Sequence, residues 1–122
     1  MCFEVTNNCL KLAYHDPRPY WISSEIITFS CSKNYGNPSG HSLWTMGISL
    51  AVVLDIYRSN PHSKLFAWLA CFIAVFIGIS VGASRLYLGA HSLDQVIYGW
   101  LLGIWLATTA EYTYKTSLMN HI

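Results

Sequence analysis

The chain has 122 residues, of which 53% are hydrophobic, 15% are aromatic and only 11% are charged. This composition is too apolar for an ordinary soluble domain, so a membrane protein is the first hypothesis and the lipid bilayer its first expected partner. The formal net charge is +1. No strong positive field exists to attract nucleic acid, and we expect no nucleic-acid partner. The sequence gives no indication of oligomeric state.

The N-terminal part of the chain predicts a short helix followed by a polar loop. Residues 1–15 are expected to be helical and to end near His15, because Pro17 and Pro19 push the residues before them out of the helical region. Residues 20–37 are rich in Ser, Asn and Gly, which is typical of a loop.

Three apolar stretches follow, at about residues 42–57, 65–83 and 95–110. A bilayer-spanning helix needs about 17 to 25 mostly apolar residues. The middle stretch, which has no charged residue, is the clearest candidate, whereas the first contains Asp55. We predict three transmembrane helices in an all-α polytopic bundle. Three buried helices of a soluble bundle are the alternative, disfavoured because the stretches show no polar stripe at helical spacing.

The connections between these stretches indicate a topology. Residues 58–64 form a predicted tight turn that carries cations, and Lys115 follows the last stretch. Threading the spans in order places residues 20–41 and 84–94 on one membrane face, and the turn and Lys115 on the other. Positive charge favours the second face as cytoplasmic, so the first is expected to be lumenal or extracellular.

Three polar motifs therefore fall at one membrane surface, namely residues 11–19 (KLAYHDPRP), 37–41 (NPSGH) and 84–95 (SRLYLGAHSLDQ). The side chains that they bring toward one region are Lys11, Arg18, Ser39, His41, Arg85 and His91. The six carboxylates are scattered and the four cysteines form no CxxC pair, so we predict no metal site. Cations without carboxylates indicate an anion site.

The chemistry of these residues suits a phosphate group. Two arginines and one lysine neutralise a phosphate dianion, as a metal ion would otherwise do. Ser39 and Gly40 precede a predicted helix, whose first N–H groups favour an anion. A neutral histidine can attack phosphorus while a second, protonated one gives its proton to the departing alkoxide.

The motifs resemble the three signatures of the type 2 phosphatidic acid phosphatase superfamily. This superfamily also includes glucose-6-phosphatases, dolichyl-diphosphatases, sphingosine-phosphate phosphatases and vanadium haloperoxidases. The first signature, Lys followed by six residues and Arg-Pro, matches residues 11–19. The second, PSGH, matches residues 38–41, and the third, Ser-Arg followed by five residues and His, matches residues 84–91. The resemblance implies that His91 is the nucleophile that forms a phosphohistidine and that His41 is the acid for the leaving group. The phosphate binders implied by the resemblance are Lys11, Arg18, Ser39, Gly40 and Arg85.

The resemblance also implies a fold, and we expect no cofactor. The family fold usually has six helices, so residues 1–122 are expected to be one phosphatase domain, N-terminally incomplete, that holds the C-terminal part of that fold. No secretory signal is found within residues 1–16.

One position departs from the usual family pattern, which places an Asp four residues after the nucleophilic histidine. Here Gln95 occupies that position and Asp94 precedes it. Gln at this place, together with RPYW at 18–21, is similar to the glucose-6-phosphatase version. Gln95 can orient His91 through its carbonyl oxygen, or Asp94 can supply the charge. Gln95 also fits a capping box with Ser92, and we expect the two roles of Gln95 to compete.

Hydrolysis of a phosphate monoester at a membrane surface is the predicted function. Lipid phosphates such as phosphatidate lead as substrates, and a glucose-6-phosphatase-like or dolichyl-diphosphatase-like activity is the competitor. A non-catalytic membrane protein that binds lipid phosphates is the hypothesis from another class. The expected location is the endoplasmic reticulum or the plasma membrane.

Overall fold

The computed structural model describes residues 2–59 and 62–119, and within these residues every regular element is a helix. The all-α prediction is therefore confirmed. The helices in chain order are α1 (Cys2–Tyr14), α2 (Pro19–Ile22), α3 (Gly40–Ser59), α4 (Lys64–Tyr87) and α5 (Leu93–Met119). The last three have 20, 24 and 27 residues, which makes them about 30 to 40 Å long at 1.5 Å per residue.

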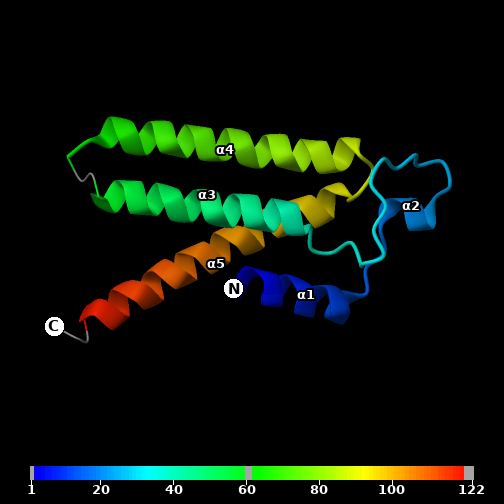
Figure 1. Ribbon diagram of the computed structural model, residues 1–122, viewed down its shortest axis with the longest axis horizontal. Helices are drawn as coiled ribbons and strands as arrows, with labels where there is room; N and C mark the ends of the chain where they lie inside the picture. Colours follow the sequence, from blue (N-terminus) through cyan, green and yellow to red (C-terminus); the bar gives the residue numbers. More distant parts are fainter. Residues whose placement is uncertain (1, 60–61, 120–122) are drawn as a thin grey trace.

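Helix α3 is the centre of the arrangement and contacts α1, α4 and α5. Helix α4 runs antiparallel beside α3, and α5 crosses α3 at an angle (Figure 1). The end of α1, the start of α3, the end of α4 and the start of α5 lie at one end of the molecule, and α2 lies beside them. The α3–α4 connection lies at the opposite end. The predicted separation of the motifs from this connection is thus confirmed, although Asn60 and Pro61 of the expected turn fall outside the described residues.

Helix α1 ends as its sequence predicts. The last helical residue is Tyr14, and His15 adopts a left-handed conformation with φ of 51°. The His15 N–H donates to the Lys11 carbonyl at 3.2 Å, which closes the helix terminus. The expected loop at 20–37 is interrupted by α2, a single turn that begins at Pro19, since proline is favoured at the first helical position.

Small residues allow α3 and α5 to approach closely. A Cβ atom on Gly103 would lie 2.5 Å from the Leu43 carbonyl oxygen, and one on Gly99 would lie 2.7 Å from that of Ser39. The two backbones are therefore in direct contact where the helices cross. Gly99 and Gly103 are therefore helix-packing positions.

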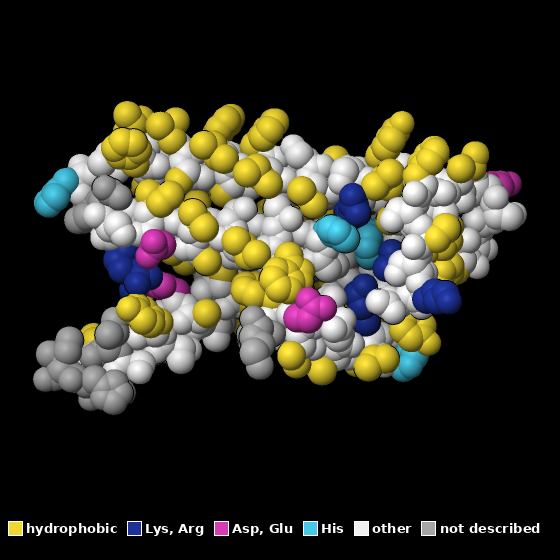
Figure 2. All heavy atoms as spheres, viewed as in Figure 1, with side chains coloured by type: hydrophobic (Ala, Val, Ile, Leu, Met, Phe, Trp, Pro, Cys, Tyr) yellow, Lys and Arg dark blue, Asp and Glu magenta, His cyan; other side chains and the backbone are white. Residues whose placement is uncertain are grey.

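Helix α4 has the properties of a membrane span. It is the one helix in the described part of the chain whose length and composition suit a bilayer crossing, with a mean hydropathy of 2.4 over its most apolar 18 residues. Only 11% of that window is buried, and Figure 2 shows hydrophobic side chains along the edge of the molecule that α4 forms. The span at 65–83 therefore agrees with α4, whereas spans within α3 and α5 stay predictions.

Candidate active site

The three motifs meet around one cavity of about 450 Å³ at the end of the bundle. Figure 2 shows Lys, Arg and His side chains gathered in this hollow between α1 and the start of α3. Six residues singled out from the sequence line it, two from each motif: Lys11 and Arg18, Gly40 and His41, Arg85 and His91.

Lys11 and Arg18 are buried, with exposed fractions of 8% and 6%, and they are held by main-chain carbonyl oxygens. Lys11 Nζ donates to Tyr35 O at 3.0 Å. Arg18 Nε donates to Asn34 O at 2.7 Å, and its Nη1 donates to Ala90 O at 2.9 Å. Neutral acceptors fix the position of both side chains without cancelling their charge, so the charge stays available to an anion.

The electrostatic environment of these cations favours an anionic ligand. Burial lowers the pKa of Lys11, the neighbouring Arg18 lowers it further, and Glu4 partly opposes the shift. Burial also lowers the pKa of Arg18, against a raising effect from Tyr20. Both shifts mean that the cationic forms are held at an energetic cost, which a bound phosphate would relieve.

His91 lies in the short connection between α4 and α5 and is only 5% exposed. Its Nε2 is 3.4 Å from Arg18 Nη1, and its Nδ1 is 3.3 Å from Gln95 Oε1. Burial and then the charge of Arg18 lower the pKa of His91 to about 4, while the hydrogen bond with Gln95 opposes the shift. The imidazole is therefore neutral at physiological pH, as a nucleophile must be.

The other lining residues complete the cavity from α3 and α4. His41, in the first turn of α3, is exposed at the cavity. Arg85, in the last turn of α4, is half-buried and its Nε donates to Ser84 Oγ at 3.3 Å. Gly40 lies beside Asn7, whose Nδ2 would be 3.2 Å from a Cβ atom at position 40.

Three residues predicted for the site, Ser39, Asp94 and Gln95, do not line the cavity. Ser39 is fully buried: its N–H donates to Gln95 O at 3.1 Å and its Oγ accepts from Ser42 Oγ at 2.9 Å. Its main-chain N–H is engaged within the protein, and a contact between phosphate and the Ser39 hydroxyl stays a prediction. Asp94 is exposed and lines, together with Gln95, a separate outer hollow.

The expectation that the two roles of Gln95 compete was wrong. A carbonyl oxygen has two lone pairs, and Gln95 Oε1 accepts from the Ser92 N–H while it lies against His91 Nδ1, each at 3.3 Å. The sequence reasoning also missed Asp16, whose Oδ2 accepts from Gln95 Nε2 at 3.1 Å. Asp16 lies inside the first motif, but the motif spacing carries no signal for a contact with the third.

The chain matches the family model of the PAP2 superfamily over residues 1–118. The chain belongs to the PAP2 superfamily. Among similar curated proteins of this kind, glucose-6-phosphatase catalytic subunit 1 of Bos taurus is 29% identical, over 94% of this chain and 39% of its own length. Dolichyldiphosphatase of Saccharomyces cerevisiae is 32% identical over 82% of this chain and 42% of its own. Lipid phosphate phosphatase delta of Arabidopsis thaliana is 27% identical over 88% and 29%.

A solved PAP2 structure shares the fold. The crystal structure of a transmembrane PAP2 type phosphatidylglycerolphosphate phosphatase from Bacillus subtilis superimposes with a TM-score of 0.81 at 23% identity. The match covers 94% of this chain and 55% of that one. This PAP2 chain thus spans about two fifths of the length of its first curated relatives and about half of its structural relative.

Proposed function

We propose that the chain is a membrane phosphatase that hydrolyses phosphate monoesters through a phosphohistidine, without a metal ion. The observation that carries the proposal is the neutral, buried His91, whose Nε2 faces the Arg18 guanidinium in a cavity lined by three cationic side chains. Family membership and the phosphatase relatives support the same chemistry.

The substrate phosphate would lie between the cations of the cavity. Arg18 and Arg85 offer planar donor groups to two phosphate oxygens, and Lys11 adds a compact charge. The first N–H groups of α3, at Gly40 and His41, point from a helix N-terminus and add further donors. Charge that develops on the phosphoryl oxygens would be stabilised by groups already fixed in place.

In the first step, His91 Nε2 attacks phosphorus and the bond from phosphorus to the alcohol oxygen breaks. Burial and then the charges of Arg85, Lys11 and Arg18 lower the pKa of His41 in the free protein. A bound phosphate dianion would oppose these charges, so that His41 is protonated in the complex and gives its proton to the departing oxygen, and a neutral alcohol leaves. In the second step, neutral His41 takes a proton from water, and the water oxygen attacks phosphorus. The bond from phosphorus to Nε2 breaks, and inorganic phosphate and neutral His91 are released.

The lining of the cavity bears on the alcohol that is released. Polar side chains prevail beyond the cations, and they are Glu4, Asn7, Ser30, Ser32, Asn34 and Thr45. The buried Asn7 Oδ1 has no hydrogen-bond partner within the described residues. Such a surface suits an alcohol rich in hydroxyl groups, which favours a sugar phosphate.

Lipid phosphates, which led on the sequence alone, become the second candidate. The cavity lies at the end of the bundle, beside the apolar outer surface of α4. A phosphatidate headgroup would reach the cations from there while its acyl chains stay in the bilayer. We place the site on the lumenal or extracellular face of the endoplasmic reticulum or plasma membrane, because the opposite end carries Arg58, Lys64 and Lys115.

The test is phosphate release by the full chain in proteoliposomes with a chelator present. Glucose 6-phosphate and phosphatidate are compared as substrates, with His91→Ala as the inactive variant and His62→Ala as the matched control at the other end. We expect phosphate release from at least one substrate, an acid-labile and base-stable phosphoenzyme, and loss of both in His91→Ala only. Binding of phosphatidate without release from either substrate would contradict the proposal and support the non-catalytic alternative.

A further inference from the structure

Gln95 is the most completely bonded side chain around the site, at 2% exposure. Its Nε2 donates to Asp16 Oδ2 at 3.1 Å and to Pro17 O at 2.9 Å. Its Oε1 accepts the Ser92 N–H and faces His91 Nδ1, each at 3.3 Å. Both amide hydrogens and both oxygen lone pairs are therefore in use.

This bonding decides the tautomer of His91. A carboxylate and a main-chain carbonyl only accept hydrogen bonds, so the amide must point its NH₂ toward Asp16 and Pro17. Its oxygen must then face His91, and a neutral imidazole beside an acceptor carries its proton on that nitrogen. The proton is on Nδ1, and the lone pair of Nε2 is directed to the cavity.

We propose that Asp16 is the positioning residue of the catalytic histidine and acts on His91 through the Gln95 amide. This inference rests on the proposed function, for which Nε2 is the attacking atom. Asp16 holds the amide in the orientation that fixes the Nδ1–H tautomer. When His91 becomes positively charged during the reaction, the carboxylate stabilises it through the polarised amide.

The arrangement also keeps the charge of Asp16 away from the substrate. Asp16 lines the outer hollow that it shares with Asp94, whereas His91 lines the catalytic cavity, and Gln95 separates the two. A carboxylate in direct contact with His91 would lie nearer to a phosphate dianion and repel it. The position of the amide is tightly bounded, because a Cβ atom at Gly36 would lie 2.6 Å from Gln95 Nε2 and Oε1.

The test uses the full chain in proteoliposomes and measures the rate of phosphoenzyme formation in a single turnover. We expect Asp16→Ala to lower this rate by about 10- to 100-fold, the usual cost of losing such an outer contact, with KM and the inhibition constant of vanadate within about twofold of wild type. Asp16→Asn, which keeps an acceptor oxygen, should lower the rate of phosphoenzyme formation less than Asp16→Ala does. Asp55→Ala, in the half of α3 that lies away from the cavity, is the matched control with no expected change.

A pair of exchanges separates positioning from a merely structural role. Gln95→Glu places a second carboxylate against Asp16 and should lower the rate strongly. Adding Asp16→Asn restores one carboxylate and one amide, so the double variant should be faster than Gln95→Glu alone. The proposal would be overturned if the double variant were no faster than Gln95→Glu, or if Asp16→Ala formed the phosphoenzyme as fast as wild type. It would also be overturned if Asp16→Ala lost rate and vanadate affinity to the same extent.

A second readout keeps failure of this inference distinct from failure of the proposed function. Nitrogen-15 NMR of the imidazole reports the tautomer of His91 whether or not the chain is active. We expect the Nδ1–H form in the wild-type protein and a mixture of tautomers in Asp16→Ala. If no substrate yields a phosphoenzyme, the proposed function fails, and an unchanged tautomer in Asp16→Ala then refutes the positioning role by itself.

Discussion

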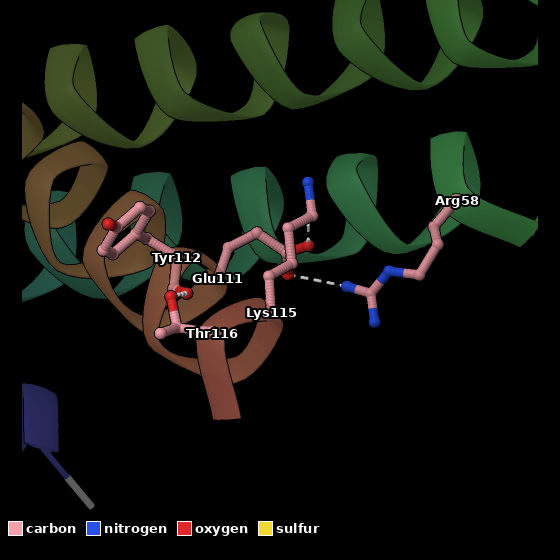
Figure 3. Close-up of polar contacts among 5 residues, drawn as sticks. All are labelled: Arg58, Glu111, Tyr112, Lys115 and Thr116. Carbon is pink, nitrogen blue, oxygen red and sulfur yellow. Dashed lines mark hydrogen bonds and ion pairs between the residues drawn. The ribbon is translucent and has the colours of Figure 1, made fainter. Parts of the chain in front are cut away.

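The cations at the two ends of the helical bundle have different partners. At the far end, Arg58 Nη2 lies 2.6 Å from Glu111 Oε2 and Lys115 Nζ lies 3.7 Å from Glu111 Oε1 (Figure 3). At the cavity end, Lys11 and Arg18 are bonded to carbonyl oxygens instead. Arg58 and Lys115 are partly exposed and share one carboxylate, whereas Lys11 and Arg18 are buried and bonded to neutral acceptors.

The difference in partners points to the cavity end as the place where a ligand binds. An exposed ion pair contributes little to stability and tolerates change. A buried cation that keeps its full charge is unfavourable for folding, so it persists where a ligand needs it. The variants below break one end at a time and are ordered from the largest expected effect to the smallest.

Arg18→Met should lower kcat/KM for phosphate ester hydrolysis by about 1,000-fold, because we expect the guanidinium to contact the phosphate and because it faces His91 Nε2. Arg18→Lys should recover only part of the activity, since an ammonium lacks the planar pair of donors. Steady-state kinetics in proteoliposomes measure both. Equal activity of the Lys and Met variants would mean that charge at this position is irrelevant.

Lys11→Met should lower kcat/KM by about 100-fold, less than the change at Arg18, because lysine contributes a point charge without the contact to His91. The same variant should weaken inhibition by vanadate, which measures anion binding without turnover. A loss of activity with unaltered vanadate affinity would argue against a phosphate contact.

The pH dependence of kcat/KM should reflect the lowered pKa of His91. Protonation removes the nucleophile, so activity is lost as pH falls through the pKa of the free enzyme. With that pKa at about 4, the acid limb, corrected for protonation of the substrate, should lie near pH 4, well below the ordinary value for histidine. In Arg18→Met, which lacks one lowering charge, the limb should move to higher pH. A limb near 6.5 in the wild type would contradict the buried, neutral state.

Arg58→Met should have the smallest effect. It removes the ion pair with Glu111 and the packing of the guanidinium over Tyr114, whose ring centroid is 5.1 Å away. We expect a loss of at most about 1 kcal/mol in stability, visible as a small fall in Tm in detergent, and activity within about twofold of wild type. A large loss of activity would show that the far end is coupled to the cavity.

Much of this structure is predictable from the sequence because the signals are local. Pro17 and Pro19 end α1, and the uncharged stretch at 65–83 indicates α4. Motif spacing and the order of the apolar stretches place His41 and His91 at one end. These predictions need only chain direction and helical periodicity.

The contacts that the sequence did not reveal are those between distant segments. Asp16 and Gln95 are 79 positions apart, and their hydrogen bond depends on how the loop after α1 folds over the start of α5. Chain proximity made Asp94 the natural alternative, but the helical turn directs it outward. The burial of Ser39 likewise depends on its hydrogen bond to Gln95, which no local pattern encodes.

The hydrogen bond from the Ser39 N–H to the Gln95 carbonyl oxygen joins the second motif to the third through main-chain atoms. Side-chain substitutions at either position leave this bond possible, but a change in chain length does not. Inserting or deleting one residue between His91 and Gln95 would rotate the first turn of α5 by about 100° relative to His91. The Gln95 carbonyl oxygen would then no longer face the Ser39 N–H. Drift among homologous proteins is therefore expected to alter the identity of residues in this stretch far more often than their number.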